Sequence, residues 1–319
     1  MRTTQSPERE LFVQTPSRLH LGIFDLPGGG YGGIGLAIAD PGVRLAARPS
    51  YTLRATGPQA DRALRAAEAL RAAYDITHGA DLQVLAAIPQ HVGLGSGTQL
   101  SLAAAALLAR VWHIDLSLET LAGLLGRGCR SHIGLEAFRT GGFVARSRWQ
   151  SGETATRLAP VPADWRFVLA VPFGMHGLSG EAETTAFRDL GPMAPAMQQQ
   201  AMHLVEAEIL PAVQGADLRR FGAGLMDLQA IVGAHFAPVQ GGRYAHPLGE
   251  AIARRFLEAG AAGVGQTSWG PAMCGVAGSQ AEAEALLRAV STLRGGDLTC
   301  WITAPANAGL KWEWHALCT

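Results

Sequence analysis

The chain has 319 residues, 48% of them hydrophobic, and its 26 Lys and Arg side chains balance 26 Asp and Glu side chains. This length fits two domains of ordinary size, and the balanced charge argues against a nucleic-acid or anionic-membrane partner. The longest apolar run, residues 102–109, is far shorter than the ~20 residues of a membrane span. A small polar substrate suits this composition better.

The first residues of the chain and the spacing of its cysteines favour a cytoplasmic location. The polar first ten residues lack the apolar core of a signal peptide. The cysteines are far apart with no Cys-x-x-Cys pair, which argues against a disulfide framework or a zinc site. They are Cys129, Cys274, Cys300 and Cys318. We therefore expect a reduced, cytoplasmic, soluble protein.

The N-terminal half predicts mixed strands and helices. Six glycines within residues 28–35 predict a sharply bent loop rather than a regular element. Asp61 can cap a helix whose apolar residues recur at helical spacing. Strands are expected at 12–23, 35–47 and 82–88, and helices from Asp61, Leu100 and Leu118 onward.

The C-terminal half predicts helices followed by a β-α-β arrangement. Prolines become frequent around residue 160, and we place a domain boundary there, which gives domains 1–160 and 161–319. Pro211 is expected to end one helix, and Asp217 to cap the next. Strands are expected at 167–171, 273–277 and 298–303, and helices at 193–210, 217–232, 247–259 and 281–290.

Residues 89–102 (PQHVGLGSGTQLSL) are the most informative stretch, because they join a predicted strand to a helix through a glycine-rich loop. Glycines let the backbone turn tightly and approach a ligand, and the loop amides and the positive end of the helix dipole then point at one place. The stretch matches neither a P-loop nor Gly-x-Gly-x-x-Gly. From the residues alone, it indicates an enzyme with a phosphate-bearing ligand, and the alternative is a plain connecting turn.

Three segments, residues 15–22, 89–102 and 263–271, together resemble the motifs of the superfamily named for galactokinase, homoserine kinase, mevalonate kinase and phosphomevalonate kinase (GHMP kinases). The resemblance implies an α+β fold of two domains, with a ribosomal-protein-S5-like N-terminal domain and a ferredoxin-like α/β sandwich at the C-terminus. The family's kinases usually carry a catalytic Asp where this chain has Gly134. This departure weighs against a kinase.

A narrower resemblance is to the β-ribofuranosylaminobenzene 5′-phosphate synthases. It is carried by residues 17–26, 32–37, 133–143 and 265–271, and the Gln-Thr-Ser-Trp-Gly-Pro run at 266–271 is its most specific element. His132 departs from the superfamily pattern, which has Gly there. The resemblance implies that phosphoribosyl pyrophosphate condenses with 4-aminobenzoate or 4-hydroxybenzoate, releasing CO₂ and pyrophosphate, in tetrahydromethanopterin biosynthesis. It also implies Mg²⁺ and a homodimer.

The chemistry of such a reaction suggests candidate roles for individual residues. Arg18, a planar fork of donors, would bind phosphate or carboxylate, and His20 would exchange a proton with the para substituent of the ring or donate to a phosphate. Glu136 would steady charge in catalysis, and Glu181 and Glu183 would bind Mg²⁺. Substrate binding would fall to Gly93, Leu94, Gly95, Ser96, Gly97, Thr98, Gln266, Thr267, Ser268 and Trp269.

Each role has a structural alternative. Arg18 and the acidic residues can form ion pairs or face solvent, and His20 and Trp269 can simply pack inside the fold. Two other functions stay open: a small-molecule kinase that holds ATP at residues 89–102, and a sensor on the same fold that binds phosphorylated ligand without turnover.

Overall fold

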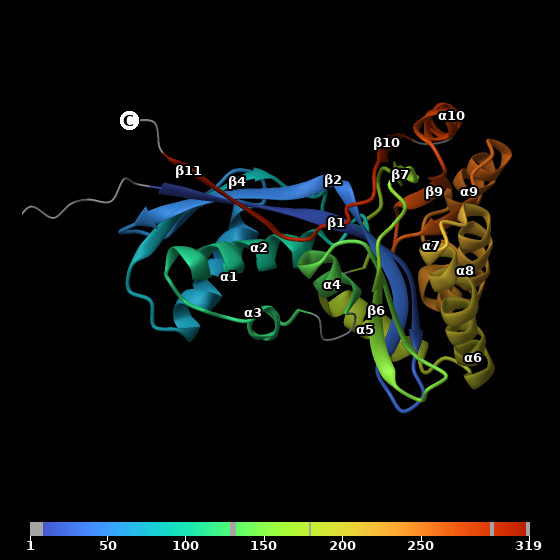
Figure 1. The fold of residues 1–319 in the computed structure, drawn as a ribbon, viewed down its shortest axis with the longest axis horizontal. Helices are drawn as coiled ribbons and strands as arrows, with labels where there is room; N and C mark the ends of the chain where they lie inside the picture. The colour runs from blue at the N-terminus through green and yellow to red at the C-terminus, as the bar shows by residue number, and fades with distance from the viewer. Residues whose placement is uncertain (1–8, 128–131, 179, 294–296, 317–319) are drawn as a thin grey trace, which may run out of the picture.

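The computed structural model describes residues 9–127, 132–178, 180–293 and 297–316. Its strands form a seven-stranded and a four-stranded sheet. Figure 1 shows the two parts side by side in an elongated molecule, with α1 and α2 on one face of the larger sheet and helices α6 to α9 gathered at the opposite end.

The larger sheet is built around the long antiparallel pair of β1 (Arg9–Asp25) and β2 (Tyr31–Ser50). Leu19, Leu21, Leu36 and Ile38 are fully buried, and the intervening His20 and Ala37 are also buried, so this part of the pair is covered on both faces. The register shifts between His20 and Gly22, and such bulges often re-aim a side chain beside an active site.

The glycine-rich segment 28–35 is a turn only in its first part, so the prediction of a loop throughout was wrong. Residues 26–30 make the turn, and the later glycines lie within β2. A Cβ added at Gly33 would overlap the carbonyl oxygen of Gly22, and one at Gly35 would overlap that of Leu19. These glycines are needed because the β1 backbone comes so close.

The remaining strands of this sheet flank the pair. They are β3 (Arg54–Thr56), β4 (Gly79–Ala86), β5 (Phe143–Arg148), β6 (Thr154–Ala159) and β11 (Lys311–Ala316). The helices of this part are α1 (Ala60–Ala73), α2 (Ser96–Val111), α3 (Leu118–Leu124) and α4 (Ile133–Arg139). The helix expected from Asp61 is confirmed, but its N-cap is Gln59, and Asp61 lies in the first turn instead.

The four strands of the smaller sheet are antiparallel and follow the order β10-β7-β9-β8. This is the ferredoxin-like order, as the resemblance implied. The strands are β7 (Arg166–Pro172), β8 (Gly263–Gln266), β9 (Met273–Ala277) and β10 (Leu298–Thr303).

Helices of this part precede β8 or join β9 to β10. They are α5 (Gly180–Leu190), α6 (Pro195–His203), α7 (Leu210–Gln214), α8 (Leu218–Gln240), α9 (Gly249–Glu258) and α10 (Gln280–Ser291). The helix predicted to stop at Pro211 continues to Gln214, after a π-helical segment, η1 (Leu204–Ile209). Pro211 is tolerated because it lies in the first turn of α7. Asp217 caps α8 as predicted, accepting a hydrogen bond from the Arg220 amide.

The end of the chain returns to the larger sheet. β11 pairs antiparallel with β1, from Arg9 opposite Ala316 to Gln14 opposite Lys311, and Figure 1 shows the two strands running together. The last strand of the predicted domain 161–319 therefore completes the sheet of the other domain. The boundary near residue 160 itself stays a prediction.

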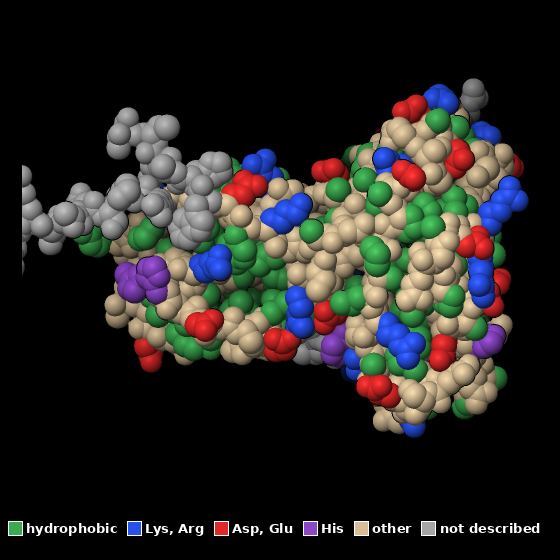
Figure 2. Space-filling model, in the orientation of Figure 1, with side chains coloured by type: hydrophobic (Ala, Val, Ile, Leu, Met, Phe, Trp, Pro, Cys, Tyr) green, Lys and Arg blue, Asp and Glu red, His purple; other side chains and the backbone are tan. Residues whose placement is uncertain are grey.

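The surface carries mixed charge. Figure 2 shows Lys and Arg side chains interspersed with Asp and Glu side chains over the visible face, without a continuous area of one sign. Within the described residues, no helix combines the length and apolar character needed to cross a membrane.

Candidate active site

Thr267 joins the three segments that the sequence singled out. Its buried hydroxyl accepts a hydrogen bond from the amide of His20 at 2.9 Å and donates one to the carbonyl of Gly93 at 2.8 Å. The amide of Ser268 donates to the carbonyl of His20 at 2.7 Å. The predicted convergence of β1, the loop before α2 and the loop after β8 is therefore present.

The first turn of α2 is open to a ligand. Gly95 is its N-cap at φ 81°, and no side chain caps the helix. The amides of Ser96, Gly97 and Thr98 occupy its first three positions, where the helix itself offers no acceptor. Uncapped amides at the positive end of a helix dipole suit an anion.

Arg18 crosses this helix end. Its Nη1 donates to the carbonyl of Gly93 at 2.7 Å, and its Cγ lies 3.2 Å from where a Cβ at Gly95 would be. Burial lowers the pKa of the guanidinium to about 10, and the Glu183 carboxylate partly offsets this shift. Arg18 therefore stays charged at neutral pH and adds a cation beside the loop.

Arg18 and Thr98 line a cavity of about 630 Å³, whereas the predicted substrate-binding residues Gly93, Leu94, Gly95, Ser96, Gly97 and Thr267 are not among its described lining residues. The residues that line the cavity are of two kinds, polar and aromatic. Arg18, His20 and Thr98 contribute polar groups, and Gly134 lies among them, with the position of an added Cβ only 3.8 Å from Arg18 Nε. The aromatic end is formed by Phe187, Phe236 and Trp269. One cavity thus offers both an anionic and an aromatic environment.

The aromatic end is a cluster of edge-to-face rings. The centroid of Trp269 lies 4.8 Å from that of Phe236 and 5.3 Å from that of Phe187. The Trp269 indole donates to Glu183 Oε1 at 3.1 Å, and only 5% of the residue is exposed. Trp269 therefore forms a wall held in place by its neighbours, with little free ring face for the stacking that the sequence suggested.

His20 is a neutral group in this cavity. Desolvation lowers its pKa to about 3, and the nearby charge of Arg18 acts in the same direction. At neutral pH the imidazole is therefore uncharged, so it offers one donor and one acceptor nitrogen rather than a cation.

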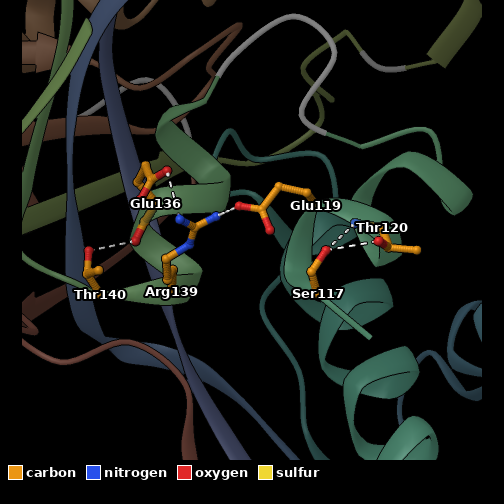
Figure 3. Close-up of polar contacts among 6 residues, drawn as sticks. All are labelled: Ser117, Glu119, Thr120, Glu136, Arg139 and Thr140. Carbon is orange, nitrogen blue, oxygen red and sulfur yellow. Dashed lines mark hydrogen bonds and ion pairs between the residues drawn. The ribbon is translucent and has the colours of Figure 1, made fainter. Parts of the chain in front are cut away.

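The three predicted acidic residues differ in where they lie. Glu181 and Glu183 on α5 both line the cavity, whereas Glu136 does not. Figure 3 shows Glu136 on α4 directed towards Arg139, 3.9 Å from its Nη1, and Arg139 in turn pairs with Glu119. The structure thus places Glu136 in an ion-pair network with Arg139 and Glu119 and not among the described residues that line the cavity.

Comparison with known proteins gives the family. Residues 61–138 match the model of the GHMP kinases N terminal domain, and residues 209–294 match that of the GHMP kinases C terminal. A β-ribofuranosylphenol 5′-phosphate synthase of Archaeoglobus fulgidus is 32% identical over 95% of this chain and 99% of the relative. The chain belongs to this synthase family, within the GHMP kinase superfamily.

Other matches agree with this membership. The Methanothermobacter thermautotrophicus protein of the same name is 30% identical over 84% of this chain and 88% of the relative. Among solved structures, Cytophaga hutchinsonii homoserine kinase has a TM-score of 0.69 at 16% identity over 98% of this chain and 100% of that chain. Lactococcus lactis galactokinase has 0.70 at 13% identity over 95% of both chains. These structures confirm the GHMP-type fold.

The site offers a synthase of this family few protein ligands for a metal. Among the described residues, no three His, Cys, Asp or Glu side chains gather in a metal-binding arrangement. Glu181 and Glu183 lie two positions apart on α5, so they project from different sides of the helix, and Glu183 also accepts from Trp269. This donor set fits Mg²⁺ only if substrate phosphates supply further ligands, as is common for this ion.

Several residues at the site were missed by the sequence reasoning. Gln229 on α8 lines the cavity, donates to the carbonyls of Leu21 and Gln266, and accepts from the Gln266 amide. Its side chain thereby joins the two sheets. Phe187, Phe236 and Arg127 also line the cavity. Gln229, Phe187 and Phe236 lie on otherwise ordinary helices and Arg127 lies in the segment after α3, so no local pattern marks any of them.

Proposed function

We propose that this protein is a β-ribofuranosylphenol 5′-phosphate synthase that joins phosphoribosyl pyrophosphate to 4-hydroxybenzoate, with release of CO₂ and pyrophosphate. The observation that carries the proposal is the single cavity with an anion-binding end at Arg18 and α2 and an aromatic end at Trp269. The names of the full-length relatives favour the phenol product, and 4-aminobenzoate is the alternative acceptor.

The reaction balances without an added oxidant or reductant. The bond from ribose C1 to the pyrophosphate oxygen breaks, and the pair of electrons leaves with pyrophosphate. The ring carbon that bears the carboxylate attacks C1. The bond from that carbon to the carboxylate then breaks, its electrons restore the aromatic ring, and CO₂ departs.

The chain's residues suit these steps. The first amides of α2 and the Arg18 guanidinium would stabilise charge on the departing pyrophosphate, and such preorganised donors are usually a large part of catalysis. The neutral His20 imidazole would accept a hydrogen bond from the para hydroxyl as the ring gains positive charge. The wall of Trp269, Phe187 and Phe236 would hold the ring and keep water from the carboxylate.

Mg²⁺ is part of the proposal. Glu181 or Glu183 would hold the ion, and its chemistry would be to supply positive charge for the pyrophosphate leaving group. The proposal also includes action as a cytoplasmic homodimer in tetrahydromethanopterin biosynthesis.

The test is release of labelled CO₂. The protein is incubated with phosphoribosyl pyrophosphate, Mg²⁺ and carboxyl-labelled 4-hydroxybenzoate or 4-aminobenzoate, and in parallel with ATP. We expect CO₂ to depend on both substrates, and Arg18→Gln to lower its rate by roughly 10²-fold or more. Arg219→Gln, an exposed position on α8, is the control and should retain full activity. ADP formation without CO₂ would instead identify a kinase.

A further inference from the structure

A second cavity, of about 370 Å³, lies beside α2, and we call it the arginine cavity. Its charged lining consists of Arg62 and Arg65 on α1 and Arg127 after α3, and the described residues that line it include no Asp or Glu. Ser101 adds a hydroxyl. Arg127 lines the larger cavity as well, so the two cavities adjoin.

The guanidinium groups of Arg62 and Arg127 approach the first turn of α2. A Cβ added at Gly97 would overlap Nη1 of Arg62 and would lie 3.7 Å from Nη1 of Arg127. The space that a side chain would occupy at Gly97 is thus taken by arginine. Two cations here face the amides of α2, which themselves form the positive end of a helix dipole.

The Glu183 carboxylate offsets part of the charge of Arg127, but the charged groups that shift the pKa of Arg62 are both arginines. Burial lowers the pKa of Arg62, and the charges of Arg127 and Arg65 act in the same direction. The Nε of Arg62 is buried and has no hydrogen-bond partner among the described residues. An anion with several acceptor oxygens would satisfy the donor and offset the repulsion.

We propose that the arginine cavity binds the terminal phosphate of the pyrophosphate leaving group, with the inner phosphate on the amides of α2. This inference rests on the proposed function and names the place to which its leaving group goes. The acceptor ring and the leaving group must lie on opposite sides of ribose C1 for displacement. The described residues that line the arginine cavity include no aromatic side chain, whereas the larger cavity is lined by Phe187, Phe236 and Trp269, so the ring would stay in the larger cavity and the leaving group would extend into the adjoining one.

Isothermal calorimetry with two probes tests the assignment. Inorganic pyrophosphate and ribose 5-phosphate, each with Mg²⁺, are titrated into the full-length protein and its variants. We expect Arg62→Gln and Arg65→Gln to weaken pyrophosphate binding by roughly 10- to 100-fold and to leave ribose 5-phosphate binding within about twofold. Arg62→Lys should fall between, since it keeps the charge but loses the planar fork.

Arg71→Gln is the matched control, because Arg71 lies on the same helix and does not line the arginine cavity. Unchanged pyrophosphate affinity in a folded Arg62→Gln protein would overturn the inference, and so would a selective loss of ribose 5-phosphate binding. Failure of the proposed function looks different: the wild-type protein would bind pyrophosphate with the expected arginine dependence but release no CO₂.

Discussion

Arg18 and His20 lie two positions apart on β1, and their side chains share one buried space. Arg18 stays charged because its guanidinium contacts the Gly93 carbonyl and has Glu183 nearby. His20 loses its charge because desolvation and Arg18 both act against the imidazolium. Arg18 therefore supplies positive charge to the cavity, and His20 supplies uncharged hydrogen-bonding nitrogens.

The low pKa of His20 predicts a pH dependence of stability. In the folded protein the pKa is about 3, against an ordinary value of 6.5. Between these values the unfolded chain binds a proton that the folded chain does not, so acidification lowers the free energy of unfolding. Between pH 6.5 and about pH 3, protonation of His20 in the unfolded chain lowers the free energy of unfolding by about 1.4 kcal/mol per pH unit. Above pH 6.5, His20 adds no pH dependence to stability.

Urea unfolding at pH 7.5, 5.5 and 4.5 measures this dependence in the wild type and in His20→Gln. The variant should lose less stability than the wild type on acidification. Parallel losses in the two proteins would contradict a neutral, buried His20.

Sequence reasoning selected the site residues that lie within distinctive local sequence patterns. Arg18, Thr267 and Trp269 lie in segments with distinctive glycine, threonine or tryptophan patterns. Arg62 and Phe187 lie on amphipathic helices, where an arginine or a phenylalanine is ordinary, so nothing local marks them. Glu136 was selected for its motif, but the chain turns its carboxylate to Arg139 instead.

The element that organises the site is the N-terminal turn of α2. Gly95 holds it in the left-handed region at φ 81°, with the side chain of Arg18 directly above. The sequence predicted the order of strand, loop and helix, but α2 begins at Ser96 and not at Leu100, so Ser96, Gly97 and Thr98 lie in the helix and not in the predicted loop. The sequence did less well at β2, because glycines also occur inside strands where two backbones approach closely.

Gly95→Val should abolish turnover and leave the protein folded. Valine would strain the left-handed backbone and push Arg18 out of place. Gly152→Val is a matched control, because Gly152 has φ 82° in the β5–β6 turn and no atom lies within 4 Å of an added Cβ. The two variants should lose similar stability in thermal melts, about 1–2 kcal/mol.

Only the Gly95 variant should lose CO₂ release. Full activity in Gly95→Val, or equal loss in both variants, would remove the assigned role of this turn.

The whole molecule is held together across its two sheets. Besides β11 on β1, the side chain of Asn307 donates to the Val161 carbonyl and accepts from the Val161 amide, both at 2.8 Å. Gln229 joins α8 to β1 and β8. Long-range pairing of this kind is hard to derive from one sequence, because the partners lie from 37 to about 300 residues apart and neither carries a local mark of the other.

These links predict one cooperative unfolding transition instead of two. In scanning calorimetry we expect a single peak whose van't Hoff and calorimetric enthalpies agree. Two resolved peaks would mean that the sheets are independent in stability. Asn307→Ala should lower the midpoint of the single transition, because it leaves the buried Val161 backbone groups without partners.

Gly134 occupies the position at which the kinases of this superfamily usually carry a catalytic Asp. Its backbone is not in the left-handed region, and a methyl group there would make only ordinary contacts at 3.8 Å with Arg18 and Thr98. Neither packing nor geometry therefore demands glycine. The proposed reaction has no incoming alcohol to deprotonate, so it needs no acid at this position, and an acid there would add a second carboxylate beside Arg18 to that of Glu183.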